Sequence, residues 1–190
     1  MLAKHFANVS SAENYSPEFQ QIRASTSVVP PTSSNTEAFN LPYSMEEMQK
    51  AISSSSLTAP GEDDIRYEMI SHLPLDTKEF LLETLNGLWI SQTSPDSWHT
   101  SIIIPSHKSG KDPELPSSYR PIALTSCVCK LFERMVNNRL VWYLETKNLL
   151  SNRQFGFRKN RSTIDPLLML SREISNAFAN QNKPDGGCVL

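Results

Sequence analysis

The stretch "SIIIPSHKSGKDPELPSSYRPIALTSCVCKLFERM", Ser101 to Met135, decides the fold. Its first residues, Ser101–Ile104, are rich in β-branched side chains, which favour a strand, and Pro105 with the polar residues behind it marks the end of that strand. After a loop of turn-forming residues, "YRPIAL" (119–124) reads as a returning strand. The stretch therefore predicts an antiparallel hairpin.

Two cations stand at the mouth of this hairpin, Lys108 near one end and Arg120 facing it. Lys offers a point charge and Arg a planar, bidentate fork, so a hairpin that fixes one of each can clamp the β- and γ-phosphates of a triphosphate. The alternative is a generic exposed hairpin with two basic residues. The nearby "SHKSGKDP" is not a Walker-type phosphate loop, because Pro105 stands where Gly is required and Asp112 where Ser or Thr is required.

Helical patterns surround the hairpin. Capping residues and apolar periodicity predict a helix from the capping box Ser44–Glu47 to about Ile52, a second around Asp63 to His72, a third capped by Asp76, a fourth from Ser126 to about Glu145, and a fifth from Ser162 or Thr163 to about Asn180 with Pro166 in its first turn. In the third helix, Leu81, Leu85, Leu88 and Trp89 form a stripe that predicts a buried face. "CVL" (188–190) begins an apolar strand.

Residues 1–43 lack such periodicity, because Ser, Pro and other turn formers interrupt each apolar run. We expect an extended arm or linker there. The chain has no run of eighteen or more apolar residues, and its first fifteen residues lack the apolar core of a secretory signal. These features predict an intracellular protein, in the nucleus or cytoplasm, with no membrane partner.

The net charge of −2 hides a division along the chain. Residues 100–161 hold eleven Lys and Arg against four Asp and Glu, whereas the remainder holds seven against sixteen. Such an asymmetry is the footprint of a surface that meets phosphates. The alternative is a solvated basic face with no partner.

The stretch "NRQFGFRKNRST", Asn152 to Thr163, mixes cations and aromatic residues. Its cations are Arg153, Arg158, Lys159 and Arg161, and its aromatic residues are Phe155 and Phe157, on either side of Gly156. Aromatic faces stack on bases, cations meet phosphates and Gly permits close backbone approach, as in surfaces that bind single-stranded nucleic acid. The alternative is a basic loop anchored by two buried Phe side chains.

Metal and thiol chemistry are not indicated. The acids Glu62–Asp64 lie after a Pro-Gly turn at the start of a predicted helix, where they favourably meet the helix dipole. Cys127, Cys129 and Cys188 have no CxxC spacing, which favours buried thiols over a zinc site or a disulfide framework.

Four segments, in this order, resemble one family. They are "APGEDDI" (59–65), "SWHTSIIIPSHKSGKDPELPSSYRPIAL" (97–124), "KLFERMVNNRL" (130–140) and "LLSNRQFGFRKNRSTIDPLLML" (149–170). Together they resemble the N-terminal, or fingers, portion of the reverse transcriptase of non-LTR retrotransposons, the LINE and jockey-like mobile elements. The resemblance covers residues 44–190, and "HFANVSSAENYSPEF" (5–19) is similar to the linker that precedes this domain.

The resemblance implies an RNA-directed DNA polymerase, a nucleotidyltransferase of the right-hand fold whose palm aspartates hold two Mg²⁺ ions. For this chain it implies an α+β, mainly helical fingers subdomain with a small antiparallel hairpin, ending at the start of the first palm strand. It assigns Lys108 and Arg120 to the triphosphate of the incoming dNTP. It assigns the basic stretch to the RNA template, to which a DNA primer is paired; the residues are Gln154, Gly156, Phe157 and Arg158, with Lys159 and Arg161 as further cations.

The chain also departs from the family pattern. Asp64 stands where the family usually has Gly after "PGxD", and the strand that in the family delivers the first palm aspartate starts at "GGCVL" (186–190), with the palm and thumb segment expected beyond it. Because two metals held by carboxylates stabilise both oxygens of nucleotidyl transfer, we expect no catalytic residue or metal ligand in this chain and no activity from it alone. The alternatives are a residual single-stranded nucleic-acid-binding module and a degenerate product without function.

Overall fold

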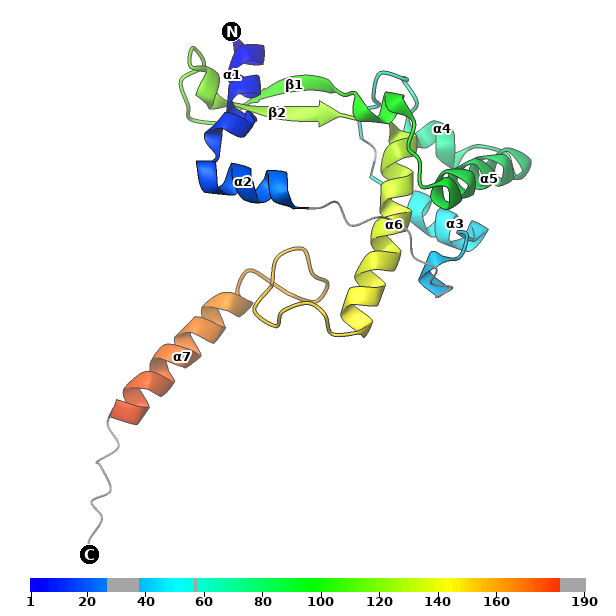
Figure 1. The fold of residues 1–190 in the computed structure, drawn as a ribbon. Helices are drawn as coiled ribbons and strands as arrows, with labels where there is room; N and C mark the ends of the chain where they lie inside the picture. The colour runs from blue at the N-terminus through cyan, green and yellow to red at the C-terminus, as the bar shows by residue number, and fades with distance from the viewer. Residues whose placement is uncertain (27–37, 57, 182–190) are drawn as a thin grey trace, which may run out of the picture. The chain divides into compact units, whose positions relative to one another are not determined.

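The computed structural model describes residues 1–26, 38–56 and 58–181 (Figure 1). Its α-helices are α1 (Leu2–Val9), α2 (Pro17–Ser25), α3 (Met45–Ser53), α4 (Tyr67–Ser71), α5 (Leu75–Ser91), α6 (Cys127–Thr146) and α7 (Asp165–Gln181). Its strands are β1 (Ile102–His107) and β2 (Tyr119–Leu124), and the 3-10 turns are η1 (Ala12–Asn14), η2 (Ala38–Asn40), η3 (Asp96–His99) and η4 (Pro116–Ser118). The described part is thus helix-rich with one two-stranded antiparallel sheet, which confirms the predicted secondary-structure content.

The chain divides into two units, Met1–Leu140 and Val141–Leu190. The extended arm predicted over residues 1–43 is wrong for part of its length, because that segment contains α1 and α2. Ser16 accepts a hydrogen bond from the Phe19 amide and Pro17 occupies the first helical position of α2, a start signal that the Pro-rich composition concealed. Within the described residues, no helix is both long and apolar enough to span a bilayer.

The predicted hairpin is present, but its first strand continues through Pro105. β1 pairs with β2 from Ile102 opposite Leu124 to His107 opposite Tyr119, and Pro105 stands opposite Pro121. The Lys108 amide donates to the Ser118 carbonyl at 2.7 Å, so these two residues are a hydrogen-bonded pair. Hydrogen-bonded and non-bonded pairs alternate along an antiparallel ladder, and the proline pair lies three positions further along. The two prolines therefore form a non-bonded pair, where a missing N–H removes no ladder bond.

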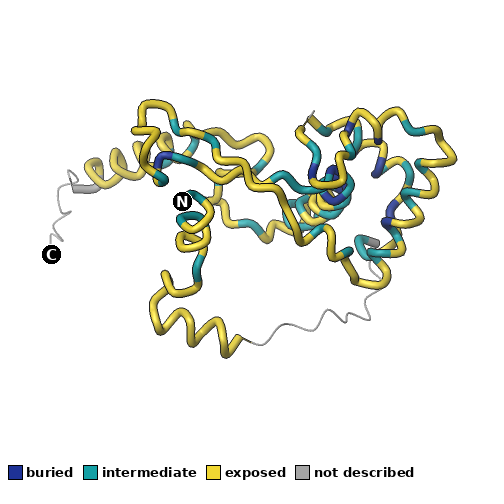
Figure 2. The backbone as a smooth tube through the Cα atoms, turned by 90° about the horizontal axis from the view of Figure 1, so that it is seen from above, coloured by how far each residue is buried: buried dark blue, intermediate teal, exposed yellow. Residues whose placement is uncertain are grey.

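The hydrophobic core lies where α3, α4, α5 and α6 meet (Figure 2). Its buried residues are Tyr43, Met48, Ala51, Tyr67, Ile70, Leu85, Cys127, Leu131 and Met135. The predicted stripe of α5 is confirmed, with Leu85 buried and the rest partly buried against the core. Cys127 and Cys129 are the buried free thiols expected, and Cys188 lies outside the described residues, as does the strand predicted at 188–190.

Two predicted helix starts are confirmed. Ser44 and Glu47 form a reciprocal capping box at α3, and the Ser126 hydroxyl accepts from the second and third amides of α6, those of Val128 and Cys129. These caps use only local atoms, so sequence alone revealed them.

Three other starts differ from the prediction. α5 begins at Leu75, so Asp76 lies in its first turn and not at its cap. α4 begins only at Tyr67, so Glu62–Asp64 lie in the preceding turn and not on the helix; there the Asp63 carboxylate accepts from the Ile65 amide. α7 begins at Asp165, with Pro166 in its first turn as predicted, and the Ser162 hydroxyl accepts from the Ile164 amide just before it.

The basic side of α6 is occupied by intramolecular contacts. The Lys130 ammonium donates to the Ala59 carbonyl at 3.3 Å, and Arg134 Nη1 donates to the Ser54 carbonyl at 2.7 Å. Arg139 forms an ion pair with Glu47, with Nε 2.6 Å from Oε1, and its guanidinium lies 3.8 Å from the centre of the Tyr43 ring. These three cations therefore fix the segments that contain their partners against α6, and their charges are used inside the fold.

The "APGEDDI" turn packs against the start of α6. A Cβ on Gly61 would lie 2.6 Å from the Ser126 nitrogen and 2.7 Å from the Thr125 carbonyl carbon, so only Gly fits. Asp64 adopts φ 54°, the left-handed conformation that Gly reaches without strain and that Asp tolerates better than most residues. The turn is therefore formed although Asp replaces the family's usual Gly.

Candidate nucleotide and nucleic-acid surfaces

The register of the hairpin separates its side chains into two faces, because residues directly opposite each other in a ladder point to the same side. One face carries Ile103, Pro105, Pro121 and Ala123. The other, which we call the open face, carries Ile102, Ile104, Ser106, Arg120, Ile122 and Leu124. The isoleucines of the open face are 45–47% exposed.

Lys108 and Arg120 both fall on the open face. Arg120 stands opposite Ser106, and Lys108 lies two residues beyond Ser106, where its amide donates to the carbonyl of Ser118, the residue just before β2. In an antiparallel ladder such diagonal neighbours are about 7–8 Å apart, within reach of two long side chains. The register thus brings the two predicted phosphate ligands to one side of the hairpin.

The two cations differ in what they contact. The Lys108 ammonium donates to the Ser117 carbonyl at 2.7 Å, which holds it next to η4. The Arg120 side chain is exposed and has no hydrogen-bond or ion-pair partner among residues 1–26, 38–56 and 58–181. The Arg120 guanidinium and the remaining donors of the Lys108 ammonium can therefore both donate to an anion on this face.

The second candidate surface, residues 147–163, lies in the unit Val141–Leu190. It carries five cations and no acid, namely Lys147, Arg153, Arg158, Lys159 and Arg161. Arg158 is the one held inside the loop: its guanidinium pairs with Glu145 at 2.7 and 2.9 Å and donates to the Ser151 carbonyl at 2.9 Å. The hydrogen bond from Arg158 holds the pKa of Glu145 below its usual value. Arg158 therefore has a structural role in shaping the loop that sequence reasoning missed.

The aromatic residues of this loop differ in exposure. Phe157 has φ 60° and is fully exposed, at 108% of its reference area, whereas Phe155 is half-buried under Arg161, whose guanidinium carbon lies 5.6 Å from the ring centre. The alternative of two buried Phe anchors is therefore wrong for Phe157. Gly156 beside it has open space where a Cβ would stand.

The remaining predicted residues of the loop are accessible. Gln154 and Lys159 are exposed, and the Gln154 carbonyl also accepts a bond from Arg158, at 3.4 Å. The loop thus presents an exposed ring, flanked by the exposed cations Lys159 and Arg161, on a backbone that Arg158 and Glu145 hold in shape.

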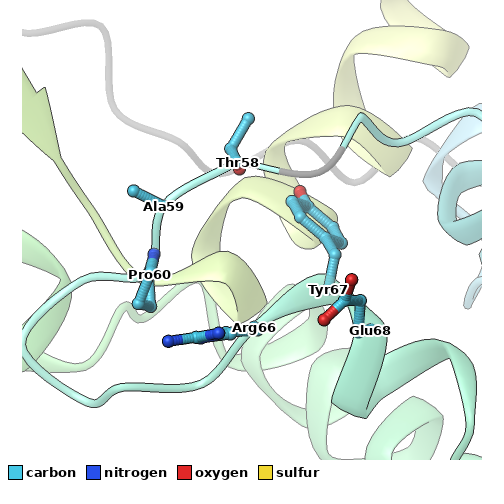
Figure 3. Close-up of a pocket in the computed structure, with 6 residues that line it drawn as sticks. All are labelled: Thr58, Ala59, Pro60, Arg66, Tyr67 and Glu68. Atoms are coloured by element: carbon cyan, nitrogen blue, oxygen red, sulfur yellow. The ribbon is translucent and has the colours of Figure 1, made fainter.

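A pocket of about 280 Å³ lies between the "APGEDDI" turn and α4 (Figure 3). Thr58, Ala59 and Pro60 line one side, and Arg66, Tyr67 and Glu68 line the other. Burial raises the pKa of Tyr67 above its usual value, so its hydroxyl stays protonated. The pocket presents one cation and one anion, and no sequence pattern predicted it.

Across the described ranges, no group of three or more His, Cys, Asp or Glu side chains is arranged to hold a metal ion. Glu62–Asp64 accordingly form a turn and not a metal cluster.

The chain matches known proteins over the segments that carry both surfaces. Residues 106–189 match the family model described as reverse transcriptase (RNA-dependent DNA polymerase). The chain is 36% identical over 138 residues to the "Probable RNA-directed DNA polymerase from transposon BS" of Drosophila melanogaster, covering 72% of this chain and 15% of that protein.

Two further relatives are polymerases of the mobile element jockey. The "RNA-directed DNA polymerase from mobile element jockey" of Drosophila melanogaster is 34% identical over 124 residues, 65% of this chain and 14% of the relative. Its counterpart in Drosophila funebris is 29% identical over 193 residues, 100% of this chain and 20% of the relative. The chain thus spans 14–20% of the length of these three relatives. With the resemblance of the four sequence segments, these matches show that the chain belongs to the reverse transcriptases of non-LTR retrotransposons.

Proposed function

We propose that this chain supplies the nucleotide- and template-contacting surfaces of an RNA-directed DNA polymerase, as the fingers of a right-hand fold. The relatives are RNA-directed DNA polymerases by name, and the family match over residues 106–189 includes Lys108, Arg120 and the basic loop. In this proposal the substrates are a dNTP and a single-stranded RNA template with its DNA primer.

The observation that carries the proposal is the placement of Lys108 and Arg120 on the open face of the hairpin. A triphosphate is polyanionic, so its binding requires fixed positive charge that intramolecular anions do not already neutralise. Arg120 meets this requirement, because it is an exposed fork for two phosphate oxygens and has no ion-pair partner in the described part of the chain. Lys108 can keep its bond to the Ser117 carbonyl and use the other N–H donors of its ammonium for phosphate oxygens.

The loop 147–163 would hold the template strand. Exposed Phe157 offers a ring on which a base stacks, and Lys159 and Arg161 offer charge to the neighbouring phosphates. Arg158 would contribute indirectly, since its bonds to Glu145 and Ser151 fix the loop that presents the ring. The full-length family enzyme is expected to use Mg²⁺ for nucleotidyl transfer, whereas Lys108, Arg120 and the loop 147–163 would bind the substrates.

Nucleotide binding can be tested with a fluorescent dNTP and the variants Arg120→Ala and Lys108→Ala. Each loses a hydrogen bond between charged groups, worth about 1.5–3 kcal/mol, so the Kd should rise roughly tenfold or more. Lys111→Ala is the matched control, since it removes the same charge from the connecting loop of the hairpin. An equal loss in all three variants would mean that only net charge matters and would contradict the proposal.

Template binding can be tested by titrating single-stranded RNA against the Phe157→Ala variant. Loss of one stacked base should weaken binding by about 1–3 kcal/mol. Ile164→Ala, which truncates another exposed apolar side chain of the same unit, should leave the Kd unchanged. The wild-type affinity should also fall with salt, with a slope of roughly −0.7 for each phosphate neutralised, and a salt-independent Kd would exclude this surface as the binding site.

A further inference from the structure

The N-terminal helix flanks the face of the hairpin opposite the two cations, where Ile103 is still 47% exposed. Pro105 and Pro121 of that face, with Leu2 and Phe6 of α1, line an apolar pocket of about 540 Å³. Leu2 and Phe6 are one helical turn apart and are the partly buried apolar residues of α1. The N-terminal helix thus directs its apolar side toward the hairpin.

The same helix also lies against η4, the turn that holds Lys108. The Ser118 carbonyl of η4 accepts from the Lys108 amide, and the Ser117 carbonyl accepts from the Lys108 ammonium, both at 2.7 Å. A continuous set of contacts therefore runs from α1 through η4 to Lys108 and, through the ladder, to Arg120.

The hairpin needs such support. A two-stranded sheet alone is marginally stable in water, and the pair Pro105–Pro121 leaves this sheet without amides at its centre to recruit a further strand. Its residues are absent from the hydrophobic core and from the partly buried residues packed against it. An eight-residue helix is likewise marginal by itself, so contact between α1 and the hairpin would stabilise both.

We propose that α1 positions the nucleotide-binding hairpin, with Phe6 as a positioning residue for the triphosphate site, an inference that rests on the proposed function. Phe6 touches no phosphate: it acts by fixing the strands and η4, and so the separation between Lys108 and Arg120. Without this preorganisation, nucleotide binding carries a larger entropic cost, because the two cations must be ordered when the nucleotide binds.

The test compares Phe6→Ala with wild type and with Val9→Ala, a truncation of an apolar residue on the same helix that is 65% exposed and lies off the hairpin. Phe6→Ala should weaken dNTP binding roughly three- to tenfold, as lost preorganisation predicts. Val9→Ala should not change it, and Phe6→Leu should restore at least half of the loss. Hydrogen exchange at the Lys108 amide should accelerate in Phe6→Ala and in neither of the other two variants.

The outcomes separate this inference from the proposed function. Tryptophan fluorescence of the core and RNA binding by the loop 147–163 should stay unchanged, which excludes global unfolding as the cause. If Arg120→Ala lowers dNTP affinity but Phe6→Ala does not, α1 is not a positioning element and the inference fails alone. If dNTP binding is insensitive to Arg120→Ala, the proposed site fails, and the inference fails with it.

Discussion

Arg139 offers the sharpest test of how the described fold is held together. Its guanidinium pairs with both oxygens of Glu47 at 2.6 and 2.7 Å. It also donates to the carbonyls of Phe39, Leu41 and Pro42 and lies over the Tyr43 ring. One side chain of α6 thus fixes the segment that leads into α3, about one hundred residues away in sequence.

The exposure of the Arg139–Glu47 ion pair sets the expected loss in the free energy of unfolding. The Arg139 side chain is 14% exposed and that of Glu47 37%, so the ion pair lies between a surface pair, worth about 0–1 kcal/mol, and a buried one, whose disruption costs about 3–5 kcal/mol. The cation–π contact adds about 1 kcal/mol, and the carbonyls, most of them at the surface, regain water when Arg139 is removed. We therefore expect Arg139→Ala to lower the free energy of unfolding by about 3 kcal/mol.

Arg139→Lys should lose roughly half as much, because Lys keeps the charge but lacks the planar fork. Urea unfolding followed by the fluorescence of Trp89, which lies 5.3 Å from the Tyr43 ring, measures both variants. Glu47→Gln keeps an acceptor for the Ser44 amide and serves as the second mutation of a double-mutant cycle. A change below about 1 kcal/mol in Arg139→Ala would refute this account of the segment.

The same pair predicts an acid dependence. Hydrogen bonds from Arg139 hold the pKa of Glu47 below its ordinary value of 4.5. The stabilisation is therefore fully present above pH 4.5 and is lost as pH falls through the lowered pKa. The difference in stability between wild type and Arg139→Ala should shrink across that acid range, and a difference that stays constant would argue against the ion pair.

Three further substitutions test local features by urea unfolding. Gly61→Ala should destabilise the fold by about 2 kcal/mol or more, since its Cβ meets the Ser126 backbone at 2.6 Å and no side chain can move away to relieve the clash; a neutral result would contradict this packing. Asp64→Ala should cost about 1 kcal/mol in a left-handed conformation, whereas Asp64→Gly should be near neutral, and equal effects would speak against positive φ. Tyr43→Phe should remove a loss of stability at alkaline pH. Burial raises the pKa of Tyr43 to about 12, so the wild-type free energy of unfolding is complete below pH 10 and falls by up to about 3 kcal/mol as pH approaches 12. If Tyr43→Phe loses as much stability as wild type over this range, the assignment to Tyr43 is refuted.

Local chemistry explains what could be predicted. The capping box at Ser44, the Ser126 cap and the Leu85 stripe depend on atoms within one or two helical turns, and the hairpin depends on β-branched runs separated by turn formers. The faces of the hairpin follow from strict alternation once the register is known. These features need no knowledge of what packs against them.

Two of the interpretations that failed concerned positions where a distant partner decides. Pro105 ended the strand by local rules, but the partner strand places another proline opposite it and leaves no ladder bond to lose. The cations Lys130, Arg134 and Arg139 read as a phosphate-facing surface, yet carbonyls more than seventy residues away occupy them. Charge patterns give the number of cations but not the identity of their partners.

The sequence by itself determined the element types, the family and the identity of the cations, because periodicity, capping and ordered segments are written in neighbouring residues. Only the tertiary structure decided which cations remain free: Arg120 stays exposed, whereas Arg139 and Arg158 are held by Glu47 and Glu145. The physical reason is that an ion pair depends on distance in space, and a chain folds residues from remote positions to within 3 Å of each other.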